Sequence, residues 1–563
     1  MTETAATSVT GATRLLESLE RLGVELVFGL PGVHNLPIWK ALSESDVRLA
    51  GVRHEQTAVY AADGYARTTG RLGVAVVTTG PGAANTLGAT GEAMASGSPV
   101  LVIATDIATT LRREGVYGGT LHETRDQTAM FRPVTKGARL LAGAEEIAGA
   151  VLESGSLALT APTGPVYLGV PTDLLRRELP AGGPAIEVTP ARVGSPESLP
   201  AAAALDRASE LLATAERPLI WAGGGALRAG AGPLVGELAR KLAAPVITTF
   251  NANGLLVRDH PCAVAGPVHA PEVGALWDES DVVLAIGSDF DGTMTQNWQM
   301  PAPPRLISIN VDHTEASKNF RPELILLGDA RAVLEQLVPR VEPRDGLGEL
   351  EARLAAIGCA VAAGVESDDP QAAAFLEIVH RALPTDAVVV TDMCIPGYWL
   401  GGYWQAPKPR KLGYPLGWGT LGFGFPASLG AALAGAGPTI CVCGDGGFMY
   451  ACGELATVVQ ERIPLTIVLV NDGGYGMLRF DQIQAGEDPF GVDLVNPDFP
   501  GLARAFGIPV RTVHGFGPDF ERALRSSVAA GEPQMIEVYA SLKPPPTTSP
   551  RWYRKPQATA RGS

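Results

Sequence analysis

Paired cysteines, long apolar runs and basic patches are all missing from this sequence of 563 residues. Its six cysteines form no CxxC pair, which argues against a disulfide framework or a zinc site. No uninterrupted apolar run is long enough to span a bilayer, and the first residues include early acids with no apolar signal core. The net charge of −15 disfavours binding to nucleic acid or to an anionic membrane. We therefore expect a cytoplasmic protein with neither of those partners.

The overall composition is typical of a globular enzyme, with 46% hydrophobic and 18% charged residues. Short β-branched runs alternate with helical stretches rich in alanine and leucine, a pattern typical of parallel sheets covered by helices. Strands are expected within residues 24–32, 72–82, 99–106, 164–171, 217–226, 244–250, 281–290, 305–312, 387–393, 439–448, 465–474 and 533–540.

The length and the spacing of these strands indicate about three domains. Proline and small residues concentrate at 178–200, which we interpret as a linker. We expect three consecutive doubly wound α/β domains at 1–182, 195–345 and 368–545, followed by a proline-rich arm or tail at 546–563. Ligands of open α/β sheets bind at the carboxyl ends of the strands, so the chemistry should lie just after them.

One expected strand ends in "GDGG", residues 444–447, where glycines allow close approach of the backbone and Asp445 offers a carboxylate. Asp472 ends the next strand, 27 residues later, a spacing that places two neighbouring strand tips side by side. A lone GDG is more often a tight turn, but the paired "NDGGYG" favours a site. Two carboxylates with the carbonyl of Gly474 suit Mg²⁺ held against a diphosphate.

This pair of motifs resembles the thiamine-diphosphate signature, in which GDG is followed one strand–helix–strand step later by two asparagines. Here Asp472 stands in place of the second asparagine. The stretch "GYPLGWGTLGFGFPASLGAALA" resembles the segment that holds the cofactor's aminopyrimidine. The resemblance implies that Leu421 bends the cofactor, that the carbonyl of Gly419 accepts its amino group and that Met449 lines the pocket. The expected cofactor residues are Gly419, Leu421, Gly444, Asp445, Gly446, Gly447, Met449, Asp472, Gly474 and Tyr475.

Within that second stretch, Gly417, Gly419 and Gly422 also form a GxGxxG pattern. A dinucleotide-binding loop is the competing interpretation, and it requires a strand that leads into the glycines. We expect no strand there and reject it.

Glu55 lies in "RHEQTAVYAADGYAR", which closely resembles the family segment carrying the glutamate that bonds to N1′ of the cofactor's pyrimidine. "TTGPGAANT", residues 78–86, follows at the expected distance. Without the resemblance, a solvated surface charge would be the default for a glutamate. With it, Glu55 is the expected catalytic acid–base group.

Nearly the whole chain resembles the acetolactate synthase, benzaldehyde lyase and 2-oxo acid decarboxylase family, whose order is pyrimidine, central and diphosphate domain. In that family the glutamate of one subunit meets the cofactor held by another. The resemblance therefore implies a homodimer or homotetramer with active sites at the subunit interface. Some relatives hold a flavin on the central domain, near the turn at 221–226 in this chain. The flavin-contact pattern is poorly matched, so we expect no required FAD.

Two histidines, His34 and His122, are expected in the loops nearest the reacting carbon, where an imidazole could relay protons. For each, a hydrogen-bonded structural histidine is the alternative. Asp289 and Asp481 stand where acetolactate synthases carry an arginine and a tryptophan for the second substrate. A carboxylate repels an anionic keto acid, which argues against a true acetolactate synthase.

The two acids could instead favour an uncharged or cationic group, or be ordinary solvated loop residues. Met477 and Phe480 could line the substrate's side-chain pocket, or could be core. The expected function is a thiamine-diphosphate- and Mg²⁺-dependent carbon–carbon lyase or carboligase that acts on a 2-oxo acid donor and a carbonyl acceptor. A simple 2-oxo acid decarboxylase or an acyloin lyase is the alternative, and a silent family member a weaker one.

Overall fold

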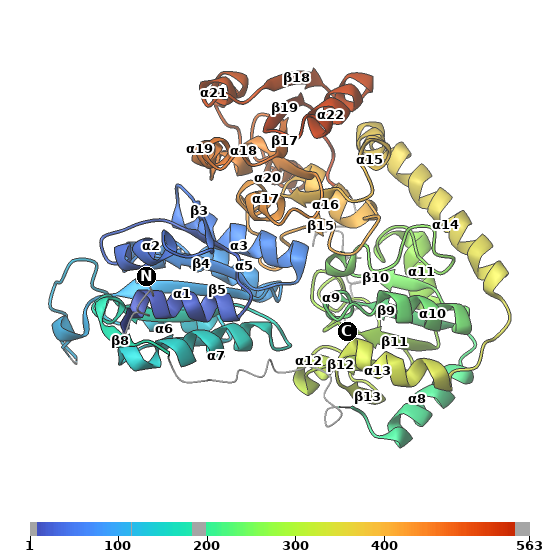
Figure 1. The fold of residues 1–563 in the computed structure, drawn as a ribbon. Coiled ribbons are helices and arrows are strands. Elements are labelled where there is room, and N and C mark those ends of the chain that lie inside the picture. The colour runs from blue at the N-terminus through green and yellow to red at the C-terminus, as the bar shows by residue number, and fades with distance from the viewer. Residues whose placement is uncertain (1–7, 114, 183–198, 546–563) are drawn as a thin grey trace, which may run out of the picture.

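The computed structural model describes residues 8–113, 115–182 and 199–545. It contains three parallel sheets, each covered by helices on both faces, which confirms the expected α/β class of three consecutive sheet domains (Figure 1). The expected tail at 546–563 and most of the expected linker lie outside the described residues. Within the described ranges, no helix combines the length and the apolarity that a membrane span requires.

The first sheet has the order β3-β2-β4-β5-β7-β6, and a short antiparallel pair, β1 with β8, lies beside it. Its faces are packed by α1, α2 and α7 on one side and by α3, α5 and α6 on the other. The strands are β1 Ser8–Thr10, β2 Leu26–Gly29, β3 Arg48–Gly51, β4 Gly73–Val77, β5 Val100–Asp106, β6 Gly137–Leu140, β7 Val166–Pro171 and β8 Glu178–Pro180. The helices are α1 Gly11–Arg21, α2 Leu36–Leu42, α3 Glu55–Thr69, α4 Pro81–Ala84, α5 Leu87–Ala95, α6 Gln127–Phe131 and α7 Ile147–Leu159.

The central sheet has the order β10-β9-β11-β12-β13. Its strands are β9 Pro218–Ala222, β10 Val246–Thr248, β11 Val282–Ile286, β12 Leu306–Asn310 and β13 Leu324–Leu327. Its helices are α8 Ala202–Ala213, α9 Gly224–Arg228, α10 Gly232–Leu242, α11 Pro271–Glu279, α12 His313–Ser317 and α13 Ala330–Leu337. The long helix α14, Leu347–Asp368, runs along the outside of the molecule to the third domain (Figure 1).

The third sheet has the order β15-β14-β16-β17-β19-β18. Its strands are β14 Val388–Thr391, β15 Leu412–Gly413, β16 Thr439–Gly444, β17 Leu465–Asn471, β18 Val510–His514 and β19 Gln534–Tyr539. Its helices are α15 Pro370–Ala382, α16 Ile395–Tyr403, α17 Gly424–Leu433, α18 Asp445–Met449, α19 Leu455–Gln460, α20 Gly476–Gln484, α21 Phe499–Ala505 and α22 Pro518–Ala530. The two-residue strand β15 precedes the GxGxxG pattern in the chain. β15 nevertheless ends four residues before Gly417 and does not run directly into the glycines.

The first and third domains share one apolar core, because α3 and α17 pack against each other with almost no side chain between them. A Cβ added to Gly64 of α3 would lie 1.9 Å from the carbonyl oxygen of Ala427. A Cβ added to Gly430 of α17 would lie 1.7 Å from the carbonyl oxygen of Ala61. Glycine is therefore required at both positions, and it allows the two backbones to touch.

Candidate active site

A cavity of about 240 Å³ lies at the carboxyl ends of β14, β16 and β17 in the third domain. The spacing of the two motifs predicts that two neighbouring strand tips lie side by side. The structure confirms this, because β16 and β17 are hydrogen-bonded neighbours. Nine of the ten expected cofactor residues line this one cavity, namely Gly419, Leu421, Gly444, Asp445, Gly446, Gly447, Asp472, Gly474 and Tyr475. Met449 does not line it within one chain and is 40% exposed.

The two candidate metal ligands sit at one end of the cavity. Asp445 is buried, and Nδ2 of Asn496 donates both to its carboxylate and to Oδ1 of Asn471, the latter over 3.1 Å. Burial and the neighbouring Asp445 raise the pKa of Asp472 to about 6. A cation between the two carboxylates would offset the repulsion that raises the pKa of Asp472, so the donor set suits a hard divalent ion.

Two positions of the GDGG turn leave no room for a side chain. A Cβ on Gly446 would lie 2.6 Å from the ring of Tyr475, and a Cβ on Gly447 would lie 2.9 Å from a carboxylate oxygen of Asp392. Both glycines also line the cavity, so backbone without a side chain faces it there, which suits the close approach of an anionic group.

The turn that carries Gly419 and Leu421 adopts left-handed backbone at Gly419, with φ +68°, and at Gly422, with φ +84°. The buried carboxylate of Asp392 anchors its far end by accepting the N–H groups of Gly422, over 2.9 Å, and Gly424, over 3.2 Å. These contacts fix which way the carbonyl of Gly419 faces.

The near end of the same turn is held from the first domain by Glu92. Its Oε2 accepts the backbone N–H of Trp418 over 2.9 Å and the hydroxyl of Thr420 over 2.8 Å. Its Oε1 accepts from Ser96 and pairs with Arg67 at 3.1 Å, and Arg67 also pairs with the buried Asp63. Burial opposes ionisation of Glu92, but Arg67 and the hydrogen bonds outweigh it and hold the pKa of Glu92 below its usual value.

Glu55 is the first residue of α3 and is half-buried. Its Oε2 accepts from Nδ2 of Asn85 over 2.9 Å, and a Cβ on Gly82 would lie 3.4 Å from its Oε1. The segment 78–86 therefore holds the carboxylate. Glu55 does not line the 240 Å³ cavity of its own chain.

His34 and His122 come together, with ring centroids 5.2 Å apart. His122 has φ +64°, and its carbonyl oxygen would be 2.4 Å from a Cβ on Gly80, so the same 78–86 loop touches Glu55 and the backbone of His122. Burial, with a smaller effect of His122, lowers the pKa of His34. The three expected catalytic residues, Glu55, His34 and His122, thus lie around one segment of the first domain.

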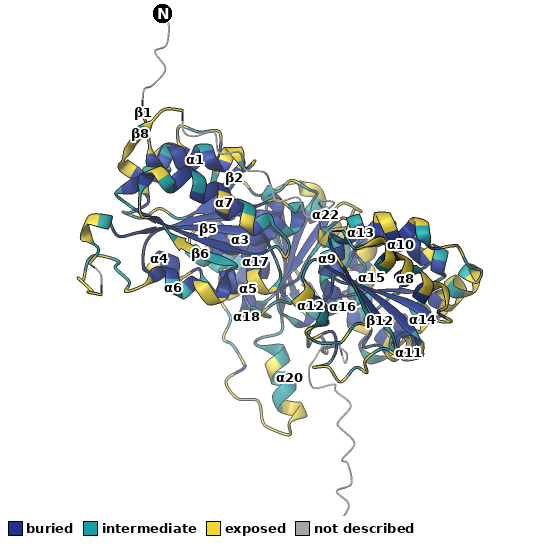
Figure 2. Cartoon of the chain, turned by 90° about the horizontal axis from the view of Figure 1, so that it is seen from below, coloured by how far each residue is buried: buried dark blue, intermediate teal, exposed yellow. Residues whose placement is uncertain are grey.

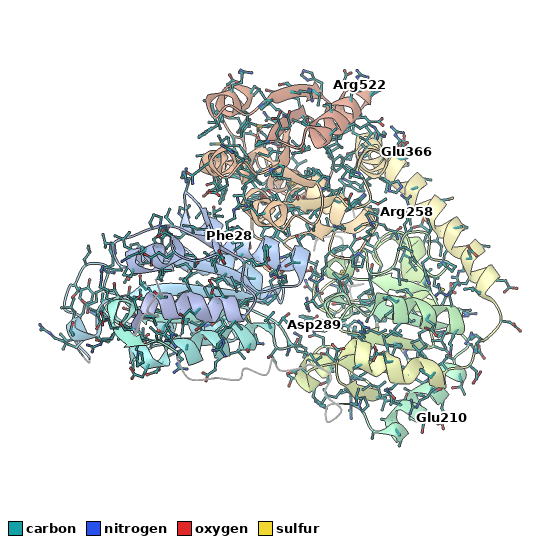
Figure 3. The ribbon with its side chains drawn as sticks, viewed as in Figure 1. Phe28, Glu210, Arg258, Asp289, Glu366 and Arg522 are labelled. Atoms are coloured by element: carbon teal, nitrogen blue, oxygen red, sulfur yellow. The ribbon has the colours of Figure 1, made fainter. Side chains whose placement is uncertain are left out.

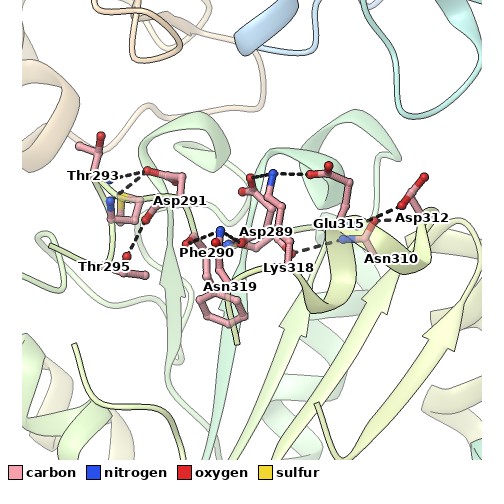
Figure 4. A network of polar contacts seen from close by, with 12 residues as sticks. Asp289, Phe290, Asp291, Thr293, Thr295, Asn310, Asp312, Glu315, Lys318 and Asn319 are labelled. Atoms are coloured by element: carbon pink, nitrogen blue, oxygen red, sulfur yellow. Dashed lines mark hydrogen bonds and ion pairs between the residues drawn. The ribbon is translucent and has the colours of Figure 1, made fainter. Parts of the chain in front are cut away.

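The four expected substrate-pocket residues do not line one pocket. Met477 lines the 240 Å³ cavity, whereas Phe480 and Asp481 lie half-buried further along α20. Asp289 lines a different cavity of about 660 Å³ between the central and first domains, and it pairs with Lys318 at 2.7 Å (Figures 3 and 4). Within one chain, therefore, Asp289 does not share a pocket with Met477.

Sequence reasoning did not single out Asn496, Glu92 or Asn85. Asn85 lies inside the motif 78–86 and could have been selected there as a side-chain donor next to Glu55. Glu92 and Asn496 carry no local signal, because their partners lie 326 and 51 residues away in the chain.

The fold and the cavity define a class of protein, three α/β domains with a cavity lined by glycines and two carboxylates at the strand ends of the third. Three family models match in chain order, described as the thiamine pyrophosphate enzyme N-terminal TPP binding domain at 9–130, central domain at 205–337 and C-terminal TPP binding domain at 394–538. The chain belongs to the thiamine pyrophosphate (thiamine diphosphate) enzyme family.

Individual relatives cover almost the whole chain. A probable 2-ketoarginine decarboxylase from Pseudomonas aeruginosa is 35% identical over 537 residues, 94% of each protein. A probable acetolactate synthase large subunit from Methanocaldococcus jannaschii is 31% identical over 94% of this chain and 91% of the relative. The acetolactate synthase isozyme 3 large subunit of Escherichia coli is 32% identical over 89% of each. This chain is accordingly an enzyme of the decarboxylase or synthase type that depends on thiamine diphosphate.

Proposed function

We propose that this enzyme uses thiamine diphosphate and Mg²⁺ to decarboxylate a 2-oxo acid. The observation that carries the proposal is the convergence of Asp445, Asp472 and the turn at Gly419 on one cavity. The relative named as a 2-ketoarginine decarboxylase supports a 2-oxo acid as the donor.

Each part of the site has a role in this reaction. Asp445, Asp472 and the carbonyl of Gly474 would hold the metal, and the glycines of the GDGG turn would face the diphosphate. Once bound, the cofactor supplies the nucleophilic carbon and the electron sink for loss of CO₂. The carbonyl of Gly419 would orient its pyrimidine.

The first domain would supply the proton transfers. Glu55 would share a proton with N1′ of the pyrimidine, and Asn85 holds its carboxylate in place. The neutral form favoured at His34 can accept a proton, and the adjacent His122 can pass one on. Two half-buried imidazoles that come together from two loops are suited to such a relay.

We also propose that a second copy of the chain completes each site. Glu55 and the metal carboxylates do not share a cavity within one chain, although the chemistry requires them on one cofactor. Large exposed apolar side chains occur beside both halves, namely Leu111, Val116, Tyr117 and Leu121 in the first domain and Trp418, Met449 and Tyr450 in the third. Pairing two chains would cover them.

A complementation assay tests this arrangement. Glu55→Gln and Asp445→Asn subunits are each expected to be inactive as homo-oligomers. Mixing and reassembling them creates one intact site per dimer, from Glu55 of one subunit and Asp445 of the other, and should restore activity. No recovery, despite mixed oligomers in native mass spectrometry, would contradict the shared site.

Two outcomes are open after decarboxylation, and different relatives favour each. Protonation releases an aldehyde, as in a decarboxylase, whereas attack on a carbonyl acceptor gives an acyloin, as in the synthases. We favour a product other than acetolactate, because Asp289 and Asp481 replace the arginine and tryptophan expected of that synthase.

The first experiment is CO₂ release from a panel of 2-oxo acids, with and without thiamine diphosphate and Mg²⁺, followed by analysis of the products. Cofactor-dependent release from at least one acid is expected. An aldehyde product identifies a decarboxylase and an acyloin a carboligase. If no acid releases CO₂, decarboxylation is excluded and acyloin cleavage becomes the next reaction to assay.

A further inference from the structure

A chain of hydrogen-bonded polar side chains lies behind the candidate metal ligands, and the proposed reaction does not use it. One end of this chain is Glu537 on β19, which is 1% exposed. Its Oε1 accepts from Nδ2 of Asn471 over 2.9 Å, and its Oε2 accepts from the hydroxyl of Thr512 over 3.3 Å. Because β19 pairs with β17, Glu537 lies beside the strand that leads into residues 472–474, which we call the metal loop.

Glu537 decides which way the side-chain amide of Asn471 faces. A carboxylate accepts hydrogen bonds and does not donate them, so Asn471 presents its NH₂ group to Glu537. Its Oδ1 is thereby free to accept the backbone N–H of Gly473 over 3.3 Å and Nδ2 of Asn496 over 3.1 Å. An amide turned the other way would place donor against donor at Gly473 and Asn496, and acceptor against acceptor at Glu537.

The same chain of hydrogen bonds reaches the first candidate metal ligand through Asn496. Its Nδ2 donates to Oδ2 of Asp445 as well as to Asn471. Since Asp445 is buried, this contact helps to fix the direction of its carboxylate. One set of hydrogen bonds thus joins the side chain of Asp445 to the backbone of the metal loop, which carries Asp472 and the carbonyl of Gly474.

The segment that carries Asn496 returns to the site from outside the body of the chain. Figure 2 shows α20 extending away from that body, and residues 483–491, at the end of α20 and beyond it, are exposed. On its return the segment is bound to the metal loop, because the N–H of Leu494 donates to the carbonyl of Gly473 over 2.9 Å. Asn496 follows two residues later and is therefore held where it meets Asp445.

We propose that Asn471 and Asn496 are positioning residues for the metal, and that the buried carboxylate of Glu537 sets the direction of their hydrogen bonds. This inference rests on the proposed function, in which Asp445 and Asp472 hold the metal. Removing a group that orients metal ligands from behind typically weakens metal binding by about 10- to 100-fold. We expect that loss when the chain of hydrogen bonds is interrupted at Glu537.

The test changes Glu537 in two ways and measures metal binding, not turnover. Glu537→Leu puts an apolar side chain of similar volume into the buried position and leaves Asn471 without its acceptor. Glu537→Gln keeps one acceptor oxygen for Asn471 and is the conservative variant. Thr512→Val removes the bond to the other oxygen of Glu537 and is the matched control.

Mn²⁺ is the probe, added to the enzyme with thiamine diphosphate, because its electron paramagnetic resonance spectrum reports both its affinity and the symmetry of its ligands. Glu537→Leu should bind Mn²⁺ about 10- to 100-fold more weakly and with an altered spectrum of the bound ion. Glu537→Gln should lose less, and Thr512→Val should stay within about twofold of the wild type. Unchanged binding in Glu537→Leu, or an equal loss in Thr512→Val, would overturn the assignment.

Asn496→Ala keeps the inference testable if Glu537→Leu does not fold, because Asn496 is half-buried and lies outside the sheet. It should weaken Mn²⁺ binding by a similar factor, and unchanged binding would overturn the role of Asn496. These measurements need no substrate, so they hold even if no 2-oxo acid releases CO₂. A wild type that binds no Mn²⁺ with thiamine diphosphate would overturn the metal site of the proposed function and this inference with it. Equal binding by the wild type and the variants would overturn this inference alone.

Discussion

The carboxylate of Glu92 accepts the backbone N–H of Trp418 over 2.9 Å, across 326 residues of chain. Through this bond and the one from Thr420, the first domain holds the turn on which Gly419 and Leu421 face the cavity. The domain that carries Glu55, the proposed catalytic glutamate, thus also positions the turn of its own chain that is proposed to hold the cofactor.

Glu92→Gln should weaken binding of thiamine diphosphate by about tenfold, because a neutral amide accepts less strongly and no longer pairs with Arg67. Equilibrium binding followed by tryptophan fluorescence gives the affinity. The near-ultraviolet circular dichroism of the bound cofactor reports whether its orientation changes.

Two further variants separate positioning from general weakening of the fold. Thr420→Val removes one of the two bonds from the turn and should shift the affinity in the same direction by less. Ser96→Ala removes a bond to the other oxygen of Glu92 and should leave the affinity within about twofold. If Ser96→Ala lost as much affinity for thiamine diphosphate as Glu92→Gln, the bonds from the turn to Glu92 would not specifically position it.

Gly430→Ala should destabilise the protein strongly, because the new methyl group would lie 1.7 Å from the carbonyl of Ala61 and the two helices cannot separate without opening the shared core. Overpacking of this kind costs about 1–3 kcal/mol or more. Gly364→Ala is the control, since a Cβ there meets nothing within 4 Å on the helix α14, and it should stabilise by about 0.5–1 kcal/mol. The apparent unfolding temperature measures both.

Glu55→Gln should lower turnover by about 10²- to 10⁴-fold, the usual contribution of a positioned acid–base group, while cofactor binding changes little. Asn85→Ala keeps the Glu55 carboxylate but removes the hydrogen bond that holds it, so it should lower turnover by less. Steady-state rates at saturating cofactor provide the measurement. Full activity in Glu55→Gln would identify a protein in which this residue is only structural.

The pKa of His34 should rise toward the ordinary histidine value of about 6.5 when His122 is replaced by glutamine, because one of the two causes that lower it is removed. Since the native state favours neutral His34, its contribution to stability is present above pH of about 6.5 and is lost as the pH falls. Eight histidines make a two-dimensional NMR titration of labelled imidazoles practicable. An unchanged His34 titration would mean that burial alone sets its pKa.

The interior strands could be read from the sequence, and most of the edge strands could not. The expected ranges cover β2, β4, β5 and β7 of the first sheet, and the interior strands of the other two sheets as well. The missed strands β1, β3, β6, β8, β13, β15 and β18 all lie at sheet edges. Interior strands are buried on both faces and so are continuously apolar, whereas edge strands such as β18, with three of its five residues exposed, carry a mixed pattern.

The residues of the candidate site also fall into those that the sequence predicts and those that it does not. The sequence alone determined Asp445, Asp472 and the glycines around them. Close backbone approach and metal coordination allow few residue types, and these residues stand at short, regular spacing in the chain. Glu92 and Asn496 were decided only by the tertiary structure, because their partners come from distant segments and no local pattern marks a buried acceptor or donor. The sequence thus determined the groups that would bind the cofactor, and the tertiary packing of distant segments decided which residues hold them in position.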